Sequence, residues 1–170
     1  DNIADLTAGT YYMAGFSESY SSTTFAPYSY HVWTGSVSGS NPATGNSDLV
    51  TVGYEYDNQQ LTINPSATNT GAMITLEAVS GQTNTYYIKS GDKYLRGFAK
   101  ANRRMGLADT SEGAEWVFSA HAKGGIQISN TFDGTAYILG TAGAASNLLR
   151  SYTSPASSLV YGVCFFKENK

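Results

Sequence analysis

Apolar and polar residues alternate in short runs along most of this chain, and stretches rich in Gly, Ser, Thr, Asn and Pro separate the runs. Alternation with a period of two is typical of β-strands that bury one face. Apolar positions at helical spacing are nearly absent, and only residues 109–114 offer a possible helical turn. The pattern predicts strands over residues 10–14, 28–33, 49–56, 60–63, 73–79, 85–89, 94–98, 104–108, 115–120, 125–129, 136–139, 147–151 and 159–166.

A short phrase recurs three times, each time after a turn-prone stretch. It reads Thr-Tyr-Tyr-Met-Ala-Gly at 10–15, Thr-Tyr-Tyr-Ile-Lys-Ser at 85–90 and Thr-Ala-Tyr-Ile-Leu-Gly at 135–140. Because threonine, tyrosine and branched residues favour extended backbone, each copy is interpreted as the opening strand of a repeated β unit. The repeats are about 1–72, 73–124 and 125–170, within a single domain of residues 1–170.

The second and third units match each other better than either matches the first. Ile-Thr-Leu-Glu at 74–77 leads into the second copy, and Ile-Gln-Ile-Ser at 126–129 leads into the third. In the first unit, about 60 residues separate Tyr12 from the next such lead-in. Short strands at this spacing are typical of a barrel or a sandwich. The chain is therefore predicted to be all-β, with an expanded first repeat.

Part of the chain resembles known modules. Tyr-Tyr-Ile-Lys-Ser-Gly-Asp-Lys-Tyr-Leu at 86–95, Glu-Trp-Val-Phe at 115–118 and Gly-Gly-Ile-Gln-Ile at 124–128 resemble β-trefoil repeats of the ricin B and fascin kinds. They also resemble small β-rich modules of secreted and surface proteins of gut Bacteroidetes. The resemblance covers residues 74–166 and implies a β-trefoil-like barrel. Ricin-type sugar sites carry Gln-x-Trp, whereas Ala114 stands two positions before Trp116, so no sugar-binding residues are carried over.

The composition is that of many secreted β proteins. Charged residues make up only 14% of the chain, against about 25% in ordinary domains, and tyrosine supplies 13 residues. Residues 1–88 contain seven acids and no Lys or Arg, while residues 89–170 contain all ten bases and six acids. The net charge of −3 argues against a nucleic-acid partner, because nonspecific binding to phosphates usually needs a basic domain.

Six of the bases fall within residues 89–104, where Asp92 is the one acid. An anion-binding strip is one interpretation of this segment. The other, which the residue types favour, is a solvated hairpin whose charges suppress aggregation. The six bases are Lys89, Lys93, Arg96, Lys100, Arg103 and Arg104.

Cys164, the one cysteine, lies in the apolar run 160–166 and is expected to be a small buried hydrophobic residue. No apolar run approaches the roughly 18 residues of a membrane helix, so no membrane span is expected. The chain begins at Asp1 and carries no signal peptide. We interpret it as a processed product, located outside the cell or at the cell surface.

The sequence lacks the usual signatures of catalysis and metal binding. His31 and His121 are the two histidines, and no His-x-x-x-His, cysteine pair, acidic calcium loop, Gly-x-Ser-x-Gly elbow or phosphate loop is present. We therefore expect no catalytic residue, no metal site and no cofactor, with loop-bound calcium left open. A site assembled only in the fold would need a histidine within about 3 Å of an acid.

Aromatic residues offer the remaining binding chemistry, because sugar rings stack on Tyr or Trp while polar groups bind their hydroxyls. Residues 25–33 hold five ring side chains, and the strands near 94 and 150 each pair an arginine with a tyrosine. Packing against the core is the competing interpretation for the residues in 25–33, and Trp116 is expected to lie in the core. The predicted ligand-binding residues are Trp33, Tyr28, Tyr30, Tyr94, Arg96, Arg150 and Tyr152.

These patterns predict a noncatalytic carbohydrate-binding or adhesive module that binds a glycan or polysaccharide by aromatic stacking. A neighbouring domain of a larger protein is a further possible partner. The alternative is a structural or protein–protein interaction module without a glycan site.

Overall fold

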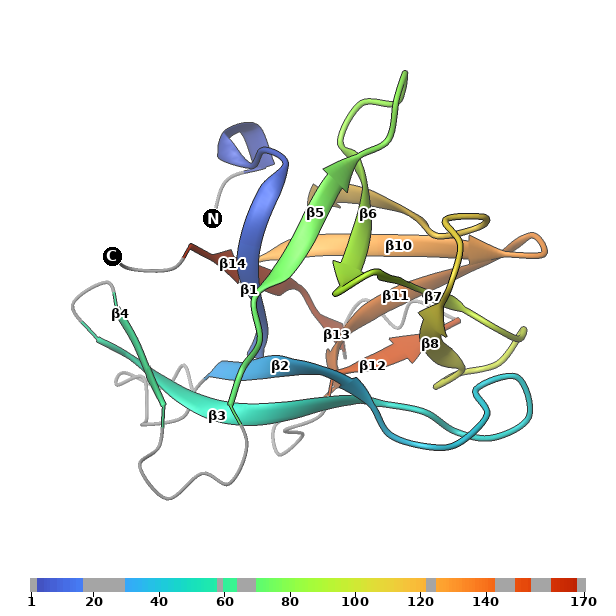
Figure 1. The fold of residues 1–170 in the computed structure, drawn as a ribbon, viewed down its shortest axis with the longest axis horizontal. Helices are drawn as coiled ribbons and strands as arrows, with labels where there is room; N and C mark the ends of the chain where they lie inside the picture. The colour runs from blue at the N-terminus through green and yellow to red at the C-terminus, as the bar shows by residue number, and fades with distance from the viewer. Residues whose placement is uncertain are drawn as a thin grey trace.

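The computed structural model describes residues 3–16, 30–57, 60–63, 70–121, 125–142, 149–153 and 160–167. Within these residues one short 3₁₀ helix precedes a succession of strands (Figure 1). The elements are η1 (Ile3–Asp5), β1 (Gly9–Phe16), β2 (Tyr30–Val37), β3 (Leu49–Asp57), β4 (Gln60–Ile63), β5 (Ile74–Ala78), β6 (Thr85–Ser90), β7 (Lys93–Gly97), β8 (Met105–Ala108), β9 (Glu115–Ala120), β10 (Ile126–Phe132), β11 (Thr135–Ala142), β12 (Arg150–Tyr152), β13 (Val160–Tyr161) and β14 (Val163–Phe166).

Each predicted strand overlaps an observed one, although residues 28, 29, 147, 148 and 159 lie outside the described part of the chain. The last predicted strand is divided into β13 and β14. The suggested helical turn at 109–114 is a non-helical turn, in which the Ala114 N–H donates to the Ser111 carbonyl at 3.0 Å.

Six strands close into a barrel through a continuous series of antiparallel pairs. Their order is β1, β5, β6, β9, β10 and β14, and β14 pairs with both β10 and β1 to complete the circuit. Closure leaves these strands without a free edge, so their backbone groups are paired on both sides. The prediction of an all-β, barrel-like chain is confirmed.

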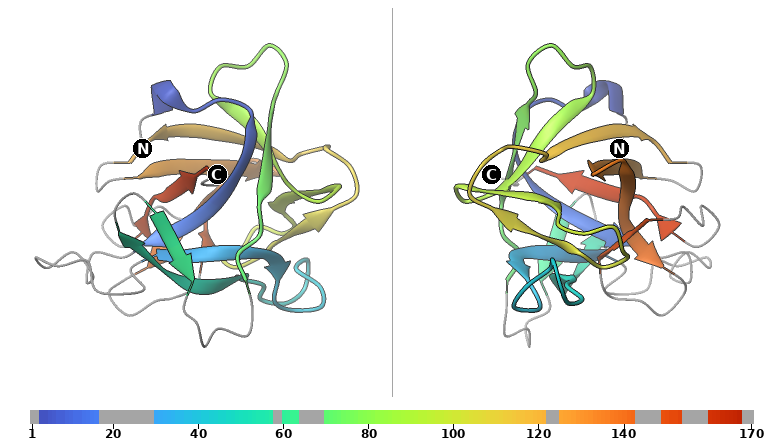
Figure 2. Two further views of the ribbon diagram at one scale, coloured as in Figure 1. Left: turned by 60° about the vertical axis from the view of Figure 1, so that its left-hand side comes forward. Right: turned by 90° about the vertical axis from the view of Figure 1, so that its right-hand side faces the viewer.

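Three extensions project from the barrel, and each begins at a barrel strand. β2 pairs with β1 and β3, β7 pairs with β6 and β8, and β11 pairs with β10 and β12. In the first extension β4 adds to β3, and in the third β13 adds to β11. Figure 1 and both views of Figure 2 show β2 and β3 below β1 and β5.

The third copy of the recurring phrase does not occupy the same place as the first two. Residues 10–15 and 85–90 lie on the barrel strands β1 and β6, whereas residues 135–140 lie on β11, in the third extension. The prediction that all three copies open equivalent units is therefore wrong for the third copy. Barrel and extension strands share the same alternation and the same preference for β-branched and aromatic residues, so the phrase does not distinguish them.

One main core fills the barrel and the space beneath the extensions. Trp33 and Trp116 are its largest fully buried side chains. The indole N–H of Trp116 donates to the Leu95 carbonyl at 2.8 Å, and that of Trp33 donates to the Ser36 carbonyl at 2.8 Å. Burial therefore leaves neither donor unpaired, which is the condition under which a buried tryptophan is tolerated. The expectation that Trp116 belongs to the core is confirmed.

A smaller apolar cluster lies on the other face of the first extension. Ala14, Val32 and Tyr54 form its buried part. Gly71 crosses this face so closely that a Cβ there would lie 2.4 Å from Val32 Cγ1, and its N–H donates to the Tyr54 hydroxyl at 3.0 Å. Because both faces of β2 are covered, His31 is buried as well, at 6% exposure.

A buried asparagine ties the third unit to the second. Asn130 on β10 is 1% exposed, and its Oδ1 accepts the Gly97 N–H at 2.8 Å. Its Nδ2 donates to the carbonyls of Gly113 at 2.8 Å and Glu115 at 2.9 Å. One side chain thus satisfies three backbone groups, at the end of β7, in the turn before β9 and at the start of β9.

Replacing Asn130 with Ala is expected to lower the free energy of unfolding by about 2–4 kcal/mol, because buried backbone groups lose their partners. Thr131→Ala, at the exposed neighbouring position on the same strand, is the control and should change it by less than about 0.5 kcal/mol. Urea unfolding monitored by circular dichroism measures both. Equal effects of the two substitutions would show that the Asn130 bonds contribute nothing.

Burial lowers the pKa of His31. Above its unfolded pKa of about 6.5 the imidazole is neutral in both states, and below it the unfolded chain takes up a proton that the folded chain resists. We therefore expect the free energy of unfolding to fall as the pH is lowered from 7.5 to 5.5. His31→Gln should flatten this dependence in urea titrations across that range. Parallel curves for the two proteins would contradict the assignment.

Candidate functional site

Of the residues predicted from the aromatic run near the start of β2, the two that the structure describes do not form an exposed platform. Trp33 is 0% exposed and belongs to the main core, so it cannot stack on a sugar, and this part of the prediction is wrong. Tyr30 is partly buried and packs edge-to-face against Phe166, with 5.2 Å between ring centroids. Tyr28 lies outside the described residues. Alternation alone did not reveal that β2 is covered on both faces.

Tyr94 and Arg96 lie on the outward face of β7, opposite the buried side chain of Leu95. Tyr94 meets Tyr87 of β6 edge-to-face, with the ring centroids 5.6 Å apart and the planes at 85°. The Lys89 ammonium lies 5.0 Å from the Tyr94 ring centroid and 3.4 Å from a Glu77 carboxylate oxygen. We call the surface formed by Tyr87, Lys89, Tyr94 and Arg96 the Tyr94 face.

Arg96 extends the Tyr94 face toward the turn before β9. Its guanidinium carbon lies 4.5 Å from the Phe98 ring centroid, and Nη1 donates to the Glu112 carbonyl at 3.2 Å. Its Nε is buried without a hydrogen-bond partner in the described structure. The Glu112 carbonyl is neutral, so this contact orients Arg96 without cancelling its charge.

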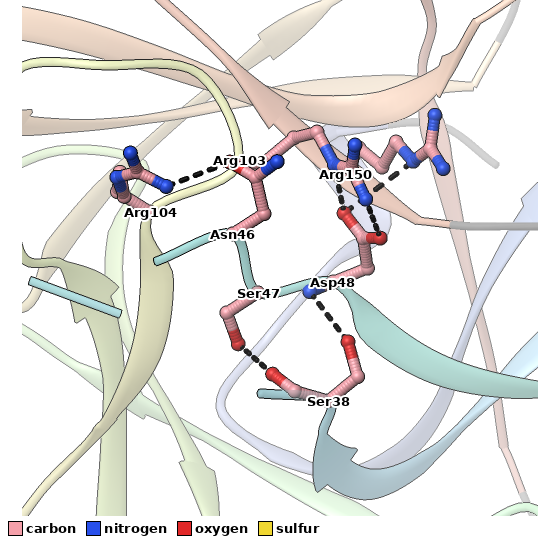
Figure 3. Close-up of polar contacts among 7 residues, drawn as sticks. All are labelled: Ser38, Asn46, Ser47, Asp48, Arg103, Arg104 and Arg150. Carbon is pink, nitrogen blue, oxygen red and sulfur yellow. Dashed lines mark hydrogen bonds and ion pairs between the residues drawn. The ribbon is translucent and has the colours of Figure 1, made fainter. Parts of the chain in front are cut away.

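Arg150 meets Asp48, which belonged to no predicted site, and Arg103, one of the six bases in residues 89–104. Asp48, Arg103 and Arg150 converge from the three extensions, and we call them the Asp48 cluster (Figure 3). Asp48 is 6% exposed. These residues lie about 50 positions apart along the chain, so no local sequence motif identifies the cluster. The available signal was the excess of acids in the first half of the sequence.

Arg103 binds Asp48 as a fork. Its Nε donates to Oδ1 at 2.9 Å and its Nη2 to Oδ2 at 2.6 Å, which is the strong bidentate arrangement of guanidinium and carboxylate. Hydrogen bonding to Asp48 raises the pKa of the Arg103 guanidinium. Arg150 approaches less closely, with its Nε 3.4 Å from Oδ1.

Tyr152 stands two residues beyond Arg150 on β12 and is partly exposed. Burial raises the pKa of its phenol, and the positive charge of Arg150 opposes that shift. The phenol is therefore neutral and able to donate a hydrogen bond at neutral pH.

The loop between β2 and β3 presents Asp48 because it folds back on itself. Gly39 has a φ of 85°, and a Cβ at this position would lie 2.5 Å from the Asn46 carbonyl oxygen, so only glycine fits. Ser38 then holds the returning chain: its Oγ accepts the Asp48 N–H at 3.0 Å, and its carbonyl accepts the Ser47 hydroxyl. Figure 3 shows both contacts on the far side of Asp48 from the arginines.

Backbone hydrogen bonds join the three extensions at the same point. The Arg103 N–H donates to the Ser151 carbonyl at 2.9 Å, and the Arg103 carbonyl accepts the Ser47 N–H at 2.6 Å. The Leu49 N–H donates to the Leu149 carbonyl at 3.0 Å. Arg103 adopts a φ of 62°, a left-handed conformation that costs a non-glycine residue about 1 kcal/mol. The ion pair and these bonds offset that cost.

The basic segment at 89–104 is largely neutralised by acids from elsewhere. Lys89 pairs with Glu77, Lys93 with Asp109, Lys100 with Asp133 and Arg103 with Asp48. The two other arginines bind neutral groups: Arg96 binds the Glu112 carbonyl, and Arg104 binds the Asn46 amide oxygen at 2.6 Å. The segment is thus a set of ion-paired turns with local positive charge at Arg96 and Arg104.

Two observations bear on chemistry beyond binding. Burial raises the pKa of the Cys164 thiol to about 11, so it is protonated at neutral pH and unsuited to attack a substrate, and its predicted burial is confirmed. Among the described residues, no three His, Cys, Asp or Glu side chains gather in a way that could hold a metal ion.

Replacing Asp48 with Asn is expected to lower the free energy of unfolding by about 3–5 kcal/mol, because it leaves two partly buried guanidinium groups without their carboxylate. Asp109→Asn removes the carboxylate from the exposed Lys93–Asp109 pair and is the matched control, with little expected effect on stability. Thermal and urea unfolding of both variants measures the difference. Similar losses would show that the Asp48 cluster does not hold the extensions together.

Within the described residues, no helix has the length and hydropathy that a membrane crossing requires. No protein-family model matches the chain, and comparison with curated proteins and with solved structures also gives no match. The case for a function therefore rests on the two surfaces described above, the Tyr94 face and the Asp48 cluster.

Proposed function

We propose that this chain is a noncatalytic glycan-binding module of an extracellular or cell-surface protein, built on a β-trefoil-like barrel. Three units that each supply two barrel strands and one extension support the trefoil assignment. An internally repeated barrel of this kind offers a rigid scaffold, and its outward strand faces are available for binding.

The observation that carries this proposal is the edge-to-face pair of Tyr87 and Tyr94 on outward strand positions. A pyranose has one apolar face rimmed by hydroxyl groups, so it matches an aromatic ring flanked by polar groups. Both tyrosines are partly exposed, in contrast to Trp33. Tyr94, and not Trp33, is therefore the stacking residue at the centre of the proposed site.

Hydrogen-bonding groups lie beside the two tyrosines. Lys89 lies over Tyr94 and is held by Glu77, and both can exchange part of that contact for sugar hydroxyls. Arg96 stands two residues beyond Tyr94 on the same strand face, where its buried Nε and fixed Nη1 orient its remaining N–H groups.

The scaffold holds this surface in place before any ligand arrives. The two tyrosines lie on paired strands, with Lys89 directly opposite Tyr94 in the register. Ser90, at the end of β6, donates its hydroxyl to the Gly35 carbonyl at 2.8 Å and so ties β6 to β2. A preorganised surface loses little conformational entropy on binding, which favours a useful affinity from few contacts.

Tyr94→Ala is expected to weaken binding to a neutral polysaccharide by at least about tenfold, which corresponds to the loss of one stacked aromatic ring. The measurement is isothermal titration calorimetry in 150 mM salt with soluble β-glucan, mannan and galactan. Tyr94→Phe keeps the aromatic ring and removes only the hydroxyl, so this control should bind within a few-fold of the parent.

Failure of the parent protein to bind any member of a broad glycan panel would overturn the proposal and favour the structural or protein–protein interaction module. Equal affinities of the Tyr94→Ala variant and the parent would show that the glycan binds elsewhere than at the Tyr94 face.

A further inference from the structure

The Asp48 cluster holds more positive charge than its acid can neutralise. Two guanidinium groups converge on one carboxylate, and Arg103 alone engages both of its oxygens. The next residue, Arg104, binds a neutral amide. The cluster therefore keeps about one net positive charge at the point where the three extensions meet.

Arg150 carries most of this uncompensated charge. Its Nε lies 3.4 Å from Asp48 Oδ1, too long and poorly aligned for a hydrogen bond, and this buried nitrogen has no hydrogen-bond partner in the described structure. Figure 3 shows the terminal nitrogens of Arg150 directed away from Asp48. The side chains of Arg150 and Arg103 are 28% and 33% exposed, so solvent and solutes reach them while Asp48 stays covered.

The backbone holds in place the two residues that carry these guanidinium groups. The backbone of Arg103 is held by its N–H and carbonyl hydrogen bonds to the neighbouring extensions, and Arg150 begins β12, where it pairs with Gly140 of β11. Asn102 adds a further tie, because its Oδ1 accepts the N–H and the hydroxyl of Thr153 at 2.7 and 3.0 Å. An anion that binds here meets donors already in place.

We propose that Arg150, supported by Arg103, forms a second subsite that binds the oxyanion of an acidic polysaccharide, a uronate carboxylate or a sulfate ester. A guanidinium whose terminal N–H groups point away from its carboxylate partner matches both oxyanions through paired hydrogen bonds. Asp48 orients the two arginines and neutralises one of their two positive charges. The subsite therefore binds one oxyanion of the polymer at a defined position and does not attract polyanions nonspecifically. The inference rests on the proposed function in one respect only, the choice of a polysaccharide as carrier of the anion.

The neighbouring tyrosine suits the same ligand. Tyr152 lies beside Arg150 on β12 and keeps its proton at neutral pH, so its phenol can donate to a sugar oxygen next to the bound anion.

The test uses two pairs of polymers that differ in charge alone: polygalacturonate with its methyl ester, and dextran sulfate with dextran. In 150 mM salt we expect the parent protein to bind a charged member at least about tenfold more tightly than its uncharged match. The carboxylate and sulfate arms show which oxyanion the subsite takes. Equal affinity for charged and uncharged members in both pairs would overturn the proposal.

Arg150→Gln is expected to remove that preference, and Arg104→Gln is the matched control. Both remove one positive charge at the same end of the molecule, but Figure 3 shows Arg104 on the other side of Asn46 from Asp48. Arg104→Gln should keep at least half of the affinity for the charged polymer. Equal losses in the two variants would indicate diffuse electrostatic attraction and contradict a defined subsite.

A loss of binding through misfolding can be distinguished from a loss of the subsite itself. Arg150→Gln leaves the Arg103–Asp48 fork intact, and its thermal midpoint is measured beside its affinity. If that variant does not fold, Arg150→Lys keeps the charge but loses the planar fork, and it should bind the charged polymer several-fold more weakly than the parent. Parent-like binding by Arg150→Lys would contradict the proposal. Tyr94→Ala should keep the preference for the charged polymer, so failure of the Tyr94 face and failure of this subsite give different results.

Discussion

The ion pair between Asp48 and Arg103, with Arg150 beside it, is the contact on which the arrangement of the three extensions depends. Closure of the barrel pairs the backbone of the barrel strands but does not determine how the extensions meet. A buried carboxylate is costly unless charged donors surround it. Asp48 obtains two hydrogen bonds from Arg103 of the second extension and an ion pair with Arg150 of the third, so the cost of burying it is met only when all three are in register.

The same contact explains the uneven distribution of charge along the chain. The first half has acids without bases and the second half has most of its charge as bases, an arrangement that suggests repulsion within each half. In the fold, Asp48 and Glu77 of the first half meet Arg103 and Lys89 of the second. Attraction between the halves thus supports assembly of the barrel, and within the basic segment 89–104 the unneutralised charge lies at Arg96 and Arg104.

Structural and binding roles are divided between the two faces of the strands. Inward positions such as Leu95, Ile88 and Trp116 are fully buried, while the outward positions beside them carry the tyrosines and cations of the Tyr94 face. The Asp48 cluster combines the two roles, because Arg103 is committed to the fold and Arg150 directs its terminal nitrogens away from the acid. A protein with few charges can in this way carry both the proposed aromatic site and the proposed anion-binding subsite.

The sequence by itself determined the strands, the all-β barrel class and the burial of Trp116 and Cys164, because period-two alternation and apolar runs are local properties that survive in the fold. Only the tertiary structure decided that the third copy of the phrase lies on β11, that Trp33 is enclosed on β2, and that Asp48 meets Arg103 and Arg150. Each of these depends on which strands pair across long separations, and strand propensity is the same whichever partner a strand finds.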